Sequence, residues 1–220
     1  MRFAYGEAPI DDDQSDARLL SELSALEREL YVSLQSTRRR AEFLAGRIAV
    51  RRAIAIALGQ ANLGDLVVAR HPDGAPKLEG ISHALAISIS HGRARAVAAA
   101  VRGNDRIGID LCDHADAPRI RRVAARAFPR EAERALALRD DLCALTAWAI
   151  KEAVGKALRI GLLYDAGFER IELLSLEPPR VRVTNELRAI ELTTRGSADG
   201  MEAIATVSPL RVSRSAPDIA

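Results

Sequence analysis

A short polar segment, "RGND" at residues 102–105, most constrains the fold of this chain, because it separates two groups of helix-like and strand-like segments. Glycine beside asparagine and aspartate is typical of a tight turn. Before it, helical patterns precede two strand-like runs; after it, a strand-like run precedes helical patterns and further strands. This order predicts an α+β protein of two halves, residues 1–104 and 105–220, although no strong sequence repeat relates them.

Hydrophobic periodicity assigns the elements within each half. Segments 15–34 and 37–59 carry apolar residues at helical spacing, and the second ends at Gly59. "LAISIS" (85–90) alternates isoleucine with serine, which is typical of a half-buried strand. The remaining patterns predict strands at 63–70, 94–101 and 106–111, helices over 117–138 (broken near Pro129) and 140–160, and an antiparallel meander beyond.

Composition excludes several classes of protein. With 48% hydrophobic and 28% charged residues, the 220-residue chain is typical of a soluble globular protein. It has no apolar run of about 18 residues that would span a membrane, and its N-terminus lacks a signal-peptide pattern. Cys112 and Cys143 share no close spacing, so no disulfide framework or zinc site is predicted, and we expect a reducing cytoplasm. A net charge of +2 and 4% aromatic residues argue against nucleic-acid binding.

The segment "WAIKEAVGKAL" (148–158) holds two of the few lysines in a chain that otherwise uses arginine. At 100° per residue, one face about 140° wide gathers Trp148, Lys151, Glu152, Gly155 and Lys156. A lysine ammonium is a compact, mobile charge that can follow a phosphoryl group and donate a proton. We therefore favour a functional face over the alternative, a surface helix with a Glu152–Lys156 pair.

Two further motifs carry candidate ligands. In "IGIDLCD" (107–113), strand alternation places Asp110 on one face with Gly108 and Cys112, and an aspartate within a strand is disfavoured unless it is needed. With Glu152, Asp110 would supply two hard oxygen ligands that suit Mg²⁺ bound partly through substrate phosphates; the alternative is an aspartate that faces water. In "ISISHG" (87–92), Ser90 and His91 close a strand, where they can hold a phosphate; the alternative is a turn histidine with no role.

"ISISHG", "GIDLCD" and "WAIKEAVGK", in this order and spacing, resemble the motifs of the 4′-phosphopantetheinyl transferases, and more closely those of the long type that activates surfactin synthetase. The turn "DGAPKL" and the arginine-bearing "FLAGRIAVRR" (43–52) are also similar to that family. The resemblance spans about residues 40–160. It implies two similar α+β halves related by a pseudo-twofold axis, an active site in the cleft between them, and a monomer.

The resemblance also implies a reaction and its residues. Phosphopantetheine would move from coenzyme A to a serine of an apo acyl or peptidyl carrier protein, releasing 3′,5′-ADP. Asp110 and Glu152 would hold Mg²⁺, with Glu152 also the base for the incoming serine. Lys156 would contact the pyrophosphate and stabilise or protonate the leaving phosphate.

The remaining implied roles concern coenzyme A. Lys151 would assist phosphate binding or pair with a carboxylate. Ser90 and His91, together with Arg51, would recognise the 3′-phosphate.

The chain departs from the family at Cys112, where a glutamate is usual and where a thiol is a poor Mg²⁺ ligand. Either water fills that coordination position or Asp113 does, and we favour water because Asp113 should point to the opposite face. In "FPREAERAL", either Glu131 or Glu133 could correspond to a further acidic residue of the family.

The carrier would dock by its acidic helix on a basic rim that could include Arg121, Arg122 and Arg126. Acyl, peptidyl and aryl carriers, and fatty acid, polyketide, siderophore or peptide synthesis, all remain open. A different class of function is a weakened relative that binds coenzyme A or carriers without transfer, for which Cys112 is the hint.

Overall fold

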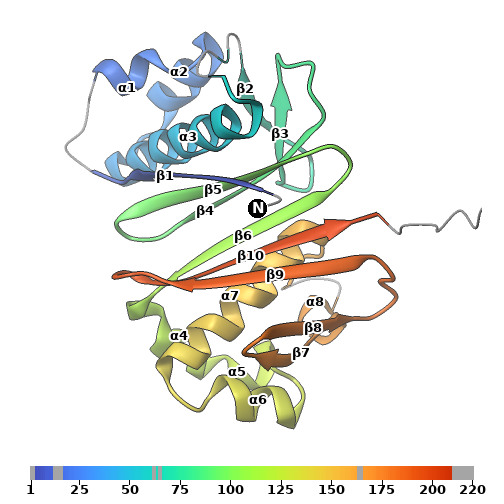
Figure 1. The fold of residues 1–220 in the computed structure, drawn as a ribbon. Helices are drawn as coiled ribbons and strands as arrows, with labels where there is room; N and C mark the ends of the chain where they lie inside the picture. The colour runs from blue at the N-terminus through green and yellow to red at the C-terminus, as the bar shows by residue number, and fades with distance from the viewer. Residues whose placement is uncertain (1–2, 12–16, 61–62, 64–65, 163–165, 210–220) are drawn as a thin grey trace, which may run out of the picture.

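The computed structural model describes residues 3–11, 17–60, 63, 66–162 and 166–209, which form four layers (Figure 1). Two three-stranded antiparallel sheets pack face to face between two helical layers. One apolar cluster lies between the sheets, and each outer cluster joins a sheet to its long helix, α3 or α7. The predicted α+β fold with two sheet-containing halves is confirmed.

The first half supplies one sheet, in the strand order β1-β5-β4, and a separate hairpin, β2-β3. Its elements are β1 (Ala4–Pro9), α1 (Ala17–Ser21), α2 (Ala25–Ser33), α3 (Thr37–Leu58), β2 (Val67–Arg70), β3 (Pro76–Glu79), β4 (Leu85–His91) and β5 (Arg95–Arg102).

The second half repeats that arrangement, with the sheet β6-β10-β9 and the hairpin β7-β8. Its elements are β6 (Arg106–Asp113), the 3₁₀ turn η1 (His114–Asp116), α4 (Ala117–Arg122), α5 (Ala124–Ala127), α6 (Glu131–Ala137), α7 (Asp141–Leu158), α8 (Gly167–Arg170), β7 (Ile171–Leu176), β8 (Pro179–Val183), β9 (Ala189–Gly196) and β10 (Gly200–Ser208). The predicted boundary between the halves, after residue 104, falls in the turn between the end of β5 at Arg102 and the start of β6 at Arg106, and it stays a prediction.

Several predicted elements are corrected. The expected helix over 15–34 is two helices, because Ser24 caps α2 and the Glu27 side chain reaches back to the Ser24 backbone; residues 15 and 16 lie outside the described part. The predicted 63–70 strand begins only at Val67, and the expected terminal meander is divided between the hairpin β7-β8 and the sheet. Strand β1, at the sheet edge opposite β4, was not predicted.

One glycine in each half brings a strand against its long helix. A Cβ at Gly6 of β1 would lie 2.2 Å from the Ala49 carbonyl oxygen of α3, and a Cβ at Gly108 of β6 would lie 1.9 Å from the Ala153 carbonyl oxygen of α7. Any larger residue would clash with helix backbone at these positions. Each glycine therefore fixes the separation of strand and helix, and at β6 this sets the position of the neighbouring Asp110.

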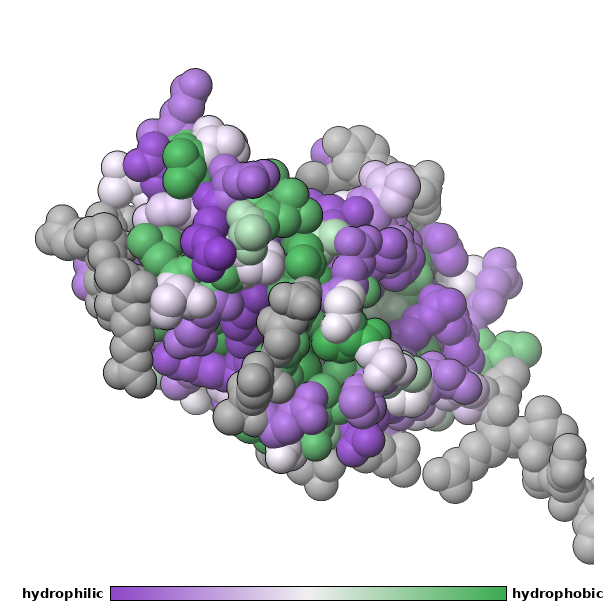
Figure 2. Space-filling model, turned by 90° about the horizontal axis from the view of Figure 1, so that it is seen from above, coloured by the Kyte–Doolittle hydropathy of each residue, from purple (hydrophilic) through white to green (hydrophobic). Residues whose placement is uncertain are grey.

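The surface over the first helical layer mixes hydrophilic and hydrophobic residues (Figure 2). Helix α2 contributes exposed Leu26, Leu30 and Val32. Among the described residues, no helix has the length and apolar character needed to cross a membrane.

Candidate active site

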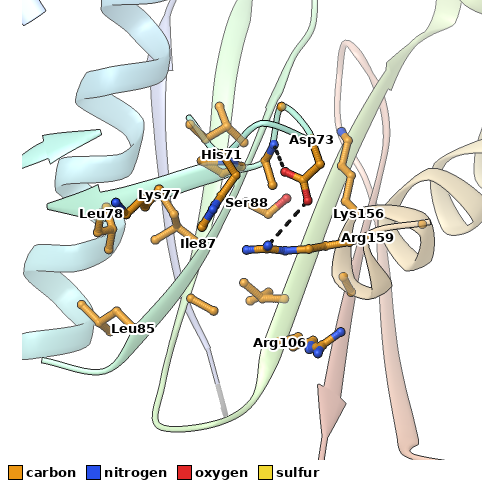
Figure 3. A pocket seen from close by; sticks show the side chains of 18 of the residues that line it. His71, Asp73, Lys77, Leu78, Leu85, Ile87, Ser88, Arg106, Lys156 and Arg159 are labelled. Carbon is orange, nitrogen blue, oxygen red and sulfur yellow. Dashed lines mark hydrogen bonds and ion pairs between the residues drawn. The ribbon is translucent and has the colours of Figure 1, made fainter. Parts of the chain in front are cut away.

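Two clefts lie on either side of Glu152, whose side chain lines both. The first cleft, of about 1030 Å³, is formed by the β2–β3 turn, strand β4 and the end of α7 (Figure 3). The second, of about 750 Å³, is formed by the end of β4, the end of β6, the α4–α5 segment and Trp148. Both clefts therefore draw residues from the two halves of the chain.

Several basic side chains lie in the lining of the first cleft. Asp73 of the β2–β3 turn and Arg159, just after α7, form an ion pair of 3.5 Å across it (Figure 3). Its further cationic or imidazole side chains are His71, Lys77, His83, Arg106 and Lys156. Apart from Lys156, these residues were not predicted as site residues, because nothing in the local sequence indicates which turns face the cleft.

Asp110 accepts hydrogen bonds from side chains of the other two predicted motifs. It lies on β6 and is buried, with Oδ1 accepting hydrogen bonds from Lys156 Nζ (2.6 Å) and Ser90 Oγ (2.9 Å). Its Oδ2 accepts a hydrogen bond from Cys112 Sγ at 3.4 Å. Lys156 also donates to the Ile109 carbonyl oxygen at 2.9 Å, so its ammonium is held between α7 and β6. The structure thus brings together Asp110, Lys156 and Ser90 from separate motifs.

Glu152 is partly buried one helical turn from Lys156. Burial, and then the negative charge of Asp110, raise the pKa of Glu152, while Lys156 and Arg119 act in the opposite direction. A carboxylate whose pKa is raised toward neutral pH is a better general base than an exposed one. Glu152 thus lies beside both clefts with its pKa raised, and its role as the base stays a prediction.

Lys151 does not reach either cleft, so its predicted role in phosphate binding is not retained. The side chain is fully buried, with Nζ 2.7 Å from Glu133 Oε1 and hydrogen bonds to the carbonyl oxygens of Ala127 and Phe168. Burial lowers the pKa of Lys151, and Glu133 opposes that shift. The alternative that Lys151 pairs with a carboxylate is the one observed, and Glu133 rather than the exposed Glu131 is the buried acid of this region.

Arg51 is likewise placed in the scaffold rather than at a phosphate site, which corrects its predicted role. Its Nη2 lies 2.7 Å from Glu27 Oε2 and also donates to the Leu66 carbonyl oxygen, while Nε donates to the Glu22 carbonyl oxygen. Arg47 approaches the other Glu27 oxygen at 3.3 Å. A guanidinium committed to a buried carboxylate and two carbonyl groups has little left to offer coenzyme A.

His91 and Ser90 both line the second cleft. The His91 ring packs on α3, where a Cβ at Gly46 would lie 2.7 Å from Nε2. Desolvation by neighbouring atoms lowers the pKa of His91 although the residue keeps an exposed surface, and Glu42 acts in the opposite direction. The predicted role of this pair at the 3′-phosphate stays a prediction.

Other members of the predicted helical face line different clefts. Trp148 lines the second cleft, with its ring centroid 5.6 Å from that of Phe168. Gly155 lines the first cleft, but a Cβ there would lie 3.0 Å from the Ile160 carbonyl oxygen, so the chain itself packs against it.

The donor set fits Mg²⁺ only as a site shared with substrate. Within the described residues, no group of three or more His, Cys, Asp or Glu side chains is arranged to hold a metal ion. Asp110 and Glu152 offer two hard carboxylates whose mutual repulsion a cation would relieve. Burial raises the pKa of the Cys112 thiol, which therefore stays neutral. The carboxylate of Asp113, the other residue considered for this coordination position, accepts a 2.7 Å hydrogen bond from the Arg93 backbone N–H. Phosphate oxygens and water would have to complete the coordination.

Of the three arginines predicted for a basic rim, one lines the second cleft. Arg126 lines that cleft, whereas Arg121 is paired with Asp141 at 2.7 Å and Arg122 is exposed. Carrier docking at these arginines stays a prediction.

Two family models match the chain. A model of the 4′-phosphopantetheinyl transferase N-terminal domain matches residues 27–101, and a model of the 4′-phosphopantetheinyl transferase superfamily matches residues 106–207. Among solved structures, the chain is similar to a crystal structure of a holo-(acyl-carrier-protein) synthase from Bacillus anthracis in complex with CoA (3′,5′-ADP). The identity is 29% and the TM-score 0.37, covering 45% of this chain and 94% of that one. A comparison with curated proteins gave no match.

Proposed function

Because the chain belongs to the 4′-phosphopantetheinyl transferase superfamily, we propose that it moves the 4′-phosphopantetheine group from coenzyme A to a serine of an apo acyl or peptidyl carrier protein. The observation that carries the proposal is the cluster of Asp110, Glu152 and Lys156, which lies where two clefts adjoin. The match to a separate N-terminal domain model supports the long, surfactin-synthetase-activating class.

The first cleft suits the nucleotide part of coenzyme A. Its volume of about 1030 Å³ is at the upper end of small-molecule sites. Lys77, Arg106 and Arg159 can neutralise phosphate groups there, and Arg159 would exchange its 3.5 Å ion pair with Asp73 for one with a phosphate. Lys156, at the end of this cleft nearest Asp110, then faces the diphosphate.

The reaction requires one proton transfer from the acceptor and one bond cleavage at phosphorus. The carrier serine oxygen attacks the phosphorus that bears pantetheine, and its proton passes to Glu152. The bond from that phosphorus to the oxygen of 3′,5′-ADP breaks, and Lys156 neutralises or protonates the departing phosphate oxygen. Such catalysis depends mainly on positioning and charge neutralisation, so no covalent enzyme intermediate is needed.

Asp110 and Glu152 would hold Mg²⁺, with the remaining positions supplied by diphosphate and water. The bound ion would neutralise charge that develops on the transferring phosphoryl group. Cys112 would not be a ligand, because its thiol is neutral and donates to Asp110.

The second cleft suits the acceptor side. Glu152 forms part of its wall, so a serine that enters there can reach the proposed base. Trp148 and Phe168 offer apolar surface, and Arg119 and Arg126 offer positive charge to an acidic carrier helix.

The test is incubation of the purified protein with apo acyl and apo peptidyl carrier proteins, coenzyme A and Mg²⁺. Mass spectrometry should show the phosphopantetheine increment on the carrier serine and equimolar 3′,5′-ADP. Glu152→Gln is the matched control. Absence of transfer to every carrier, with coenzyme A still bound in calorimetry, would instead support the non-transferring binding module.

A further inference from the structure

The long helix α7 ends on an arginine whose backbone adopts a conformation that favours glycine. Arg159 has φ 58° and ψ 39°, in the left-handed region, and its backbone N–H donates to the carbonyl oxygens of Gly155 and Lys156. The other long helix, α3, ends in the same conformation at Gly59. In this conformation a Cβ comes close to the following carbonyl oxygen, which costs free energy that glycine avoids. The chain therefore keeps arginine at position 159 against the preference of the backbone.

The Arg159 side chain reaches across the first cleft to the β2–β3 turn (Figure 3). Its Nη1 lies 3.5 Å from Asp73 Oδ2, and no other ion pair of this guanidinium occurs within the described part of the chain. Because both side chains line the cleft and are 48% and 47% exposed, the pair lies at the mouth of the cleft. A pair this exposed, and longer than the roughly 2.7–2.9 Å of a strong charge-assisted contact, contributes little to stability. The ion pair alone therefore does not explain why arginine occupies a strained position.

Asp73 is held by its own turn. Its Oδ1 accepts a hydrogen bond from the Ala75 backbone N–H at 3.0 Å, which leaves Oδ2 turned toward Arg159 (Figure 3). The carboxylate thus occupies the place beside the guanidinium that an anionic oxygen of a ligand would take. Since the turn holds Asp73 and the helix end holds the Arg159 backbone, the pair opens by movement of the Arg159 side chain alone.

The charges around this pair favour an anionic ligand. The other lysine, arginine and carboxylate side chains that line the cleft are Lys77, Arg106, Lys156 and Glu152. Three of these are cationic and one is anionic, so an entering phosphate group meets a net positive wall. Lys156 donates to Asp110 at 2.6 Å and Lys77 lies 2.7 Å from Glu79. Both contacts are shorter than the pair at the mouth, which is therefore easier to replace.

We propose that Arg159 binds a phosphate group of the donor, and that Asp73 occupies the Arg159 guanidinium until the donor enters and so sets the affinity for coenzyme A. The inference rests on the proposed function and adds a control of its donor site. A phosphate offers the planar guanidinium a bidentate contact, which one carboxylate oxygen at 3.5 Å does not. The strain at position 159 then has a reason, because the left-handed helix end places a guanidinium at the mouth of the cleft.

Two variants at position 159 separate the ligand role from a structural one. Arg159→Gln removes the guanidinium and keeps the strain, whereas Arg159→Gly removes both. Each should raise the Kd for coenzyme A about tenfold, the contribution of a hydrogen bond to a charged group. Calorimetry without carrier measures this. Only Arg159→Gly should also raise Tm, by about 2–4 °C, and the combination of higher stability with weaker binding is not expected of a residue that merely ends a helix.

Asn185→Gly is the matched control for strain. Asn185 also has a left-handed backbone, with φ 62°, but it lies in the turn after β8 and lines neither cleft. Asparagine tolerates this conformation better than arginine does, so Tm should rise by less than in Arg159→Gly. The Kd for coenzyme A should stay that of the wild type.

The role of Asp73 is tested by Asp73→Asn, whose amide oxygen can still accept from Ala75. This variant should lower the Kd for coenzyme A a few-fold, because an exposed ion pair competes only weakly. In the Arg159→Gln background the same change should have no effect, since the competition needs both partners. A gain that persists in that background would reflect only the loss of a negative charge and would overturn the control by Asp73.

Two donors identify the phosphate and keep this inference separate from the transfer reaction. If Arg159→Gln weakens the binding of coenzyme A but not of 3′-dephospho-coenzyme A, the contact is with the 3′-phosphate, and equal weakening of both means a contact with the diphosphate. An unchanged Kd for coenzyme A in Arg159→Gln would overturn this inference and leave the proposed function standing. Failure of the wild-type protein to bind coenzyme A would overturn both.

Discussion

The two halves of the molecule share a scaffold position by position. Gly6 meets Ala49 and Ala53 of α3 in the first half, and Gly108 meets Ala153 and Ala157 of α7 in the second, the same spacing in each helix. The sheets have the same strand order. The duplication therefore lies in backbone geometry, where glycine is required, and is not visible as repeated sequence.

Each half also buries a glutamate against a cation of its long helix. Glu27 pairs with Arg51 and accepts a hydrogen bond from the Val68 backbone N–H of β2. In the second half, Glu133 pairs with Lys151 and accepts one from the corresponding hairpin strand, β7, at the Leu173 N–H. The glutamate in each half thus ties a short helix, the long helix and a hairpin together. In the spacing set by Gly6 and Gly108, Lys151 corresponds to Arg47, which approaches Glu27 at 3.3 Å, and Arg51 is a second partner of that glutamate.

The halves differ where the proposed chemistry lies. Arg52 donates to the Glu7 carbonyl oxygen as Lys156 donates to that of Ile109, so Arg52 occupies the position of Lys156. When Gly6 is matched with Gly108 and Ala49 with Ala153, Ala8 takes the position of Asp110 and Ile48 takes that of Glu152. Ala8, Ile48 and Arg52 line a small cavity of about 170 Å³, far smaller than either cleft beside Glu152. The comparison teaches that duplication supplied the framework, and that two carboxylates and one lysine distinguish the second half.

The largest predicted effect comes from making position 152 neutral. Glu152→Gln should lower the transfer rate by about 10²–10⁴-fold, the usual contribution of a general base. Because burial and Asp110 disfavour the charged form, the amide should leave the free energy of unfolding equal to or above that of the wild type. Single-turnover transfer and urea unfolding measure the two quantities. A rate within tenfold of wild type would exclude Glu152 as the base.

The buried glutamates should give the next largest effect, this time on stability in both halves. Glu27→Gln or Glu133→Gln leaves a buried cation without its carboxylate, which costs about 3–5 kcal/mol. Urea unfolding measures the loss. If the variant in one half loses little stability, the two glutamates are not equivalent.

The deficit of Glu133→Gln should shrink as pH rises. Burial already lowers the pKa of Lys151, and loss of Glu133 removes the main opposing influence. Between the folded-state pKa and the ordinary value for lysine, the unfolded chain binds more protons, so stability rises with pH. Unfolding at pH 7 and pH 9 tests this, and a constant deficit would contradict it.

Replacing the lysine by the residue used in the first half should have a moderate effect. Arg52 shows that an arginine in this position can reach the strand carbonyl, so Lys156→Arg should fold normally. Guanidinium does not release a proton, so transfer should fall about 10²-fold, the lower end of the usual contribution of a positioned proton donor. The matched control is Arg52→Lys, which should leave kcat unchanged. Near-normal turnover in Lys156→Arg would refute proton donation by Lys156.

The sequence predicted the motifs better than the surroundings of their side chains. Helical projection placed Lys151 on one face with Glu152 and Lys156, and because α7 is helical over these residues the directions in which they leave the helix are as projected. It could not show that α6 and α8 cover the Lys151 side of α7, so the lysine is buried there. The projection therefore predicted the direction of the Lys151 side chain but not the helices that cover it. The same limitation applies to Arg51, which α2 covers through Glu27.

Strand β1 and the first cleft were not predicted for a related reason. β1 is a short edge strand, and the sequence indicates neither its partner β5 nor the helix α3 that covers it. Arg106 and Arg159 line the cleft only because β6 and the end of α7 adjoin the β2–β3 turn. Local patterns carry no information on such contacts between distant segments.

The smallest predicted effect concerns Cys112, which occupies the position where the resemblance implies a glutamate. Its buried thiol donates to Asp110 Oδ2, so the site carries one negative charge fewer than a three-carboxylate site would. Cys112→Glu should lower the Mg²⁺ concentration for half-maximal transfer a few-fold and make Tm depend more strongly on Mg²⁺, because the ion would then relieve a third repulsive charge. Cys112→Gln matches the size without the charge and should shift neither quantity. An equal Mg²⁺ requirement in Cys112→Glu and wild type would mean that two carboxylates with substrate oxygens already saturate the ion, and that the thiol costs the site nothing.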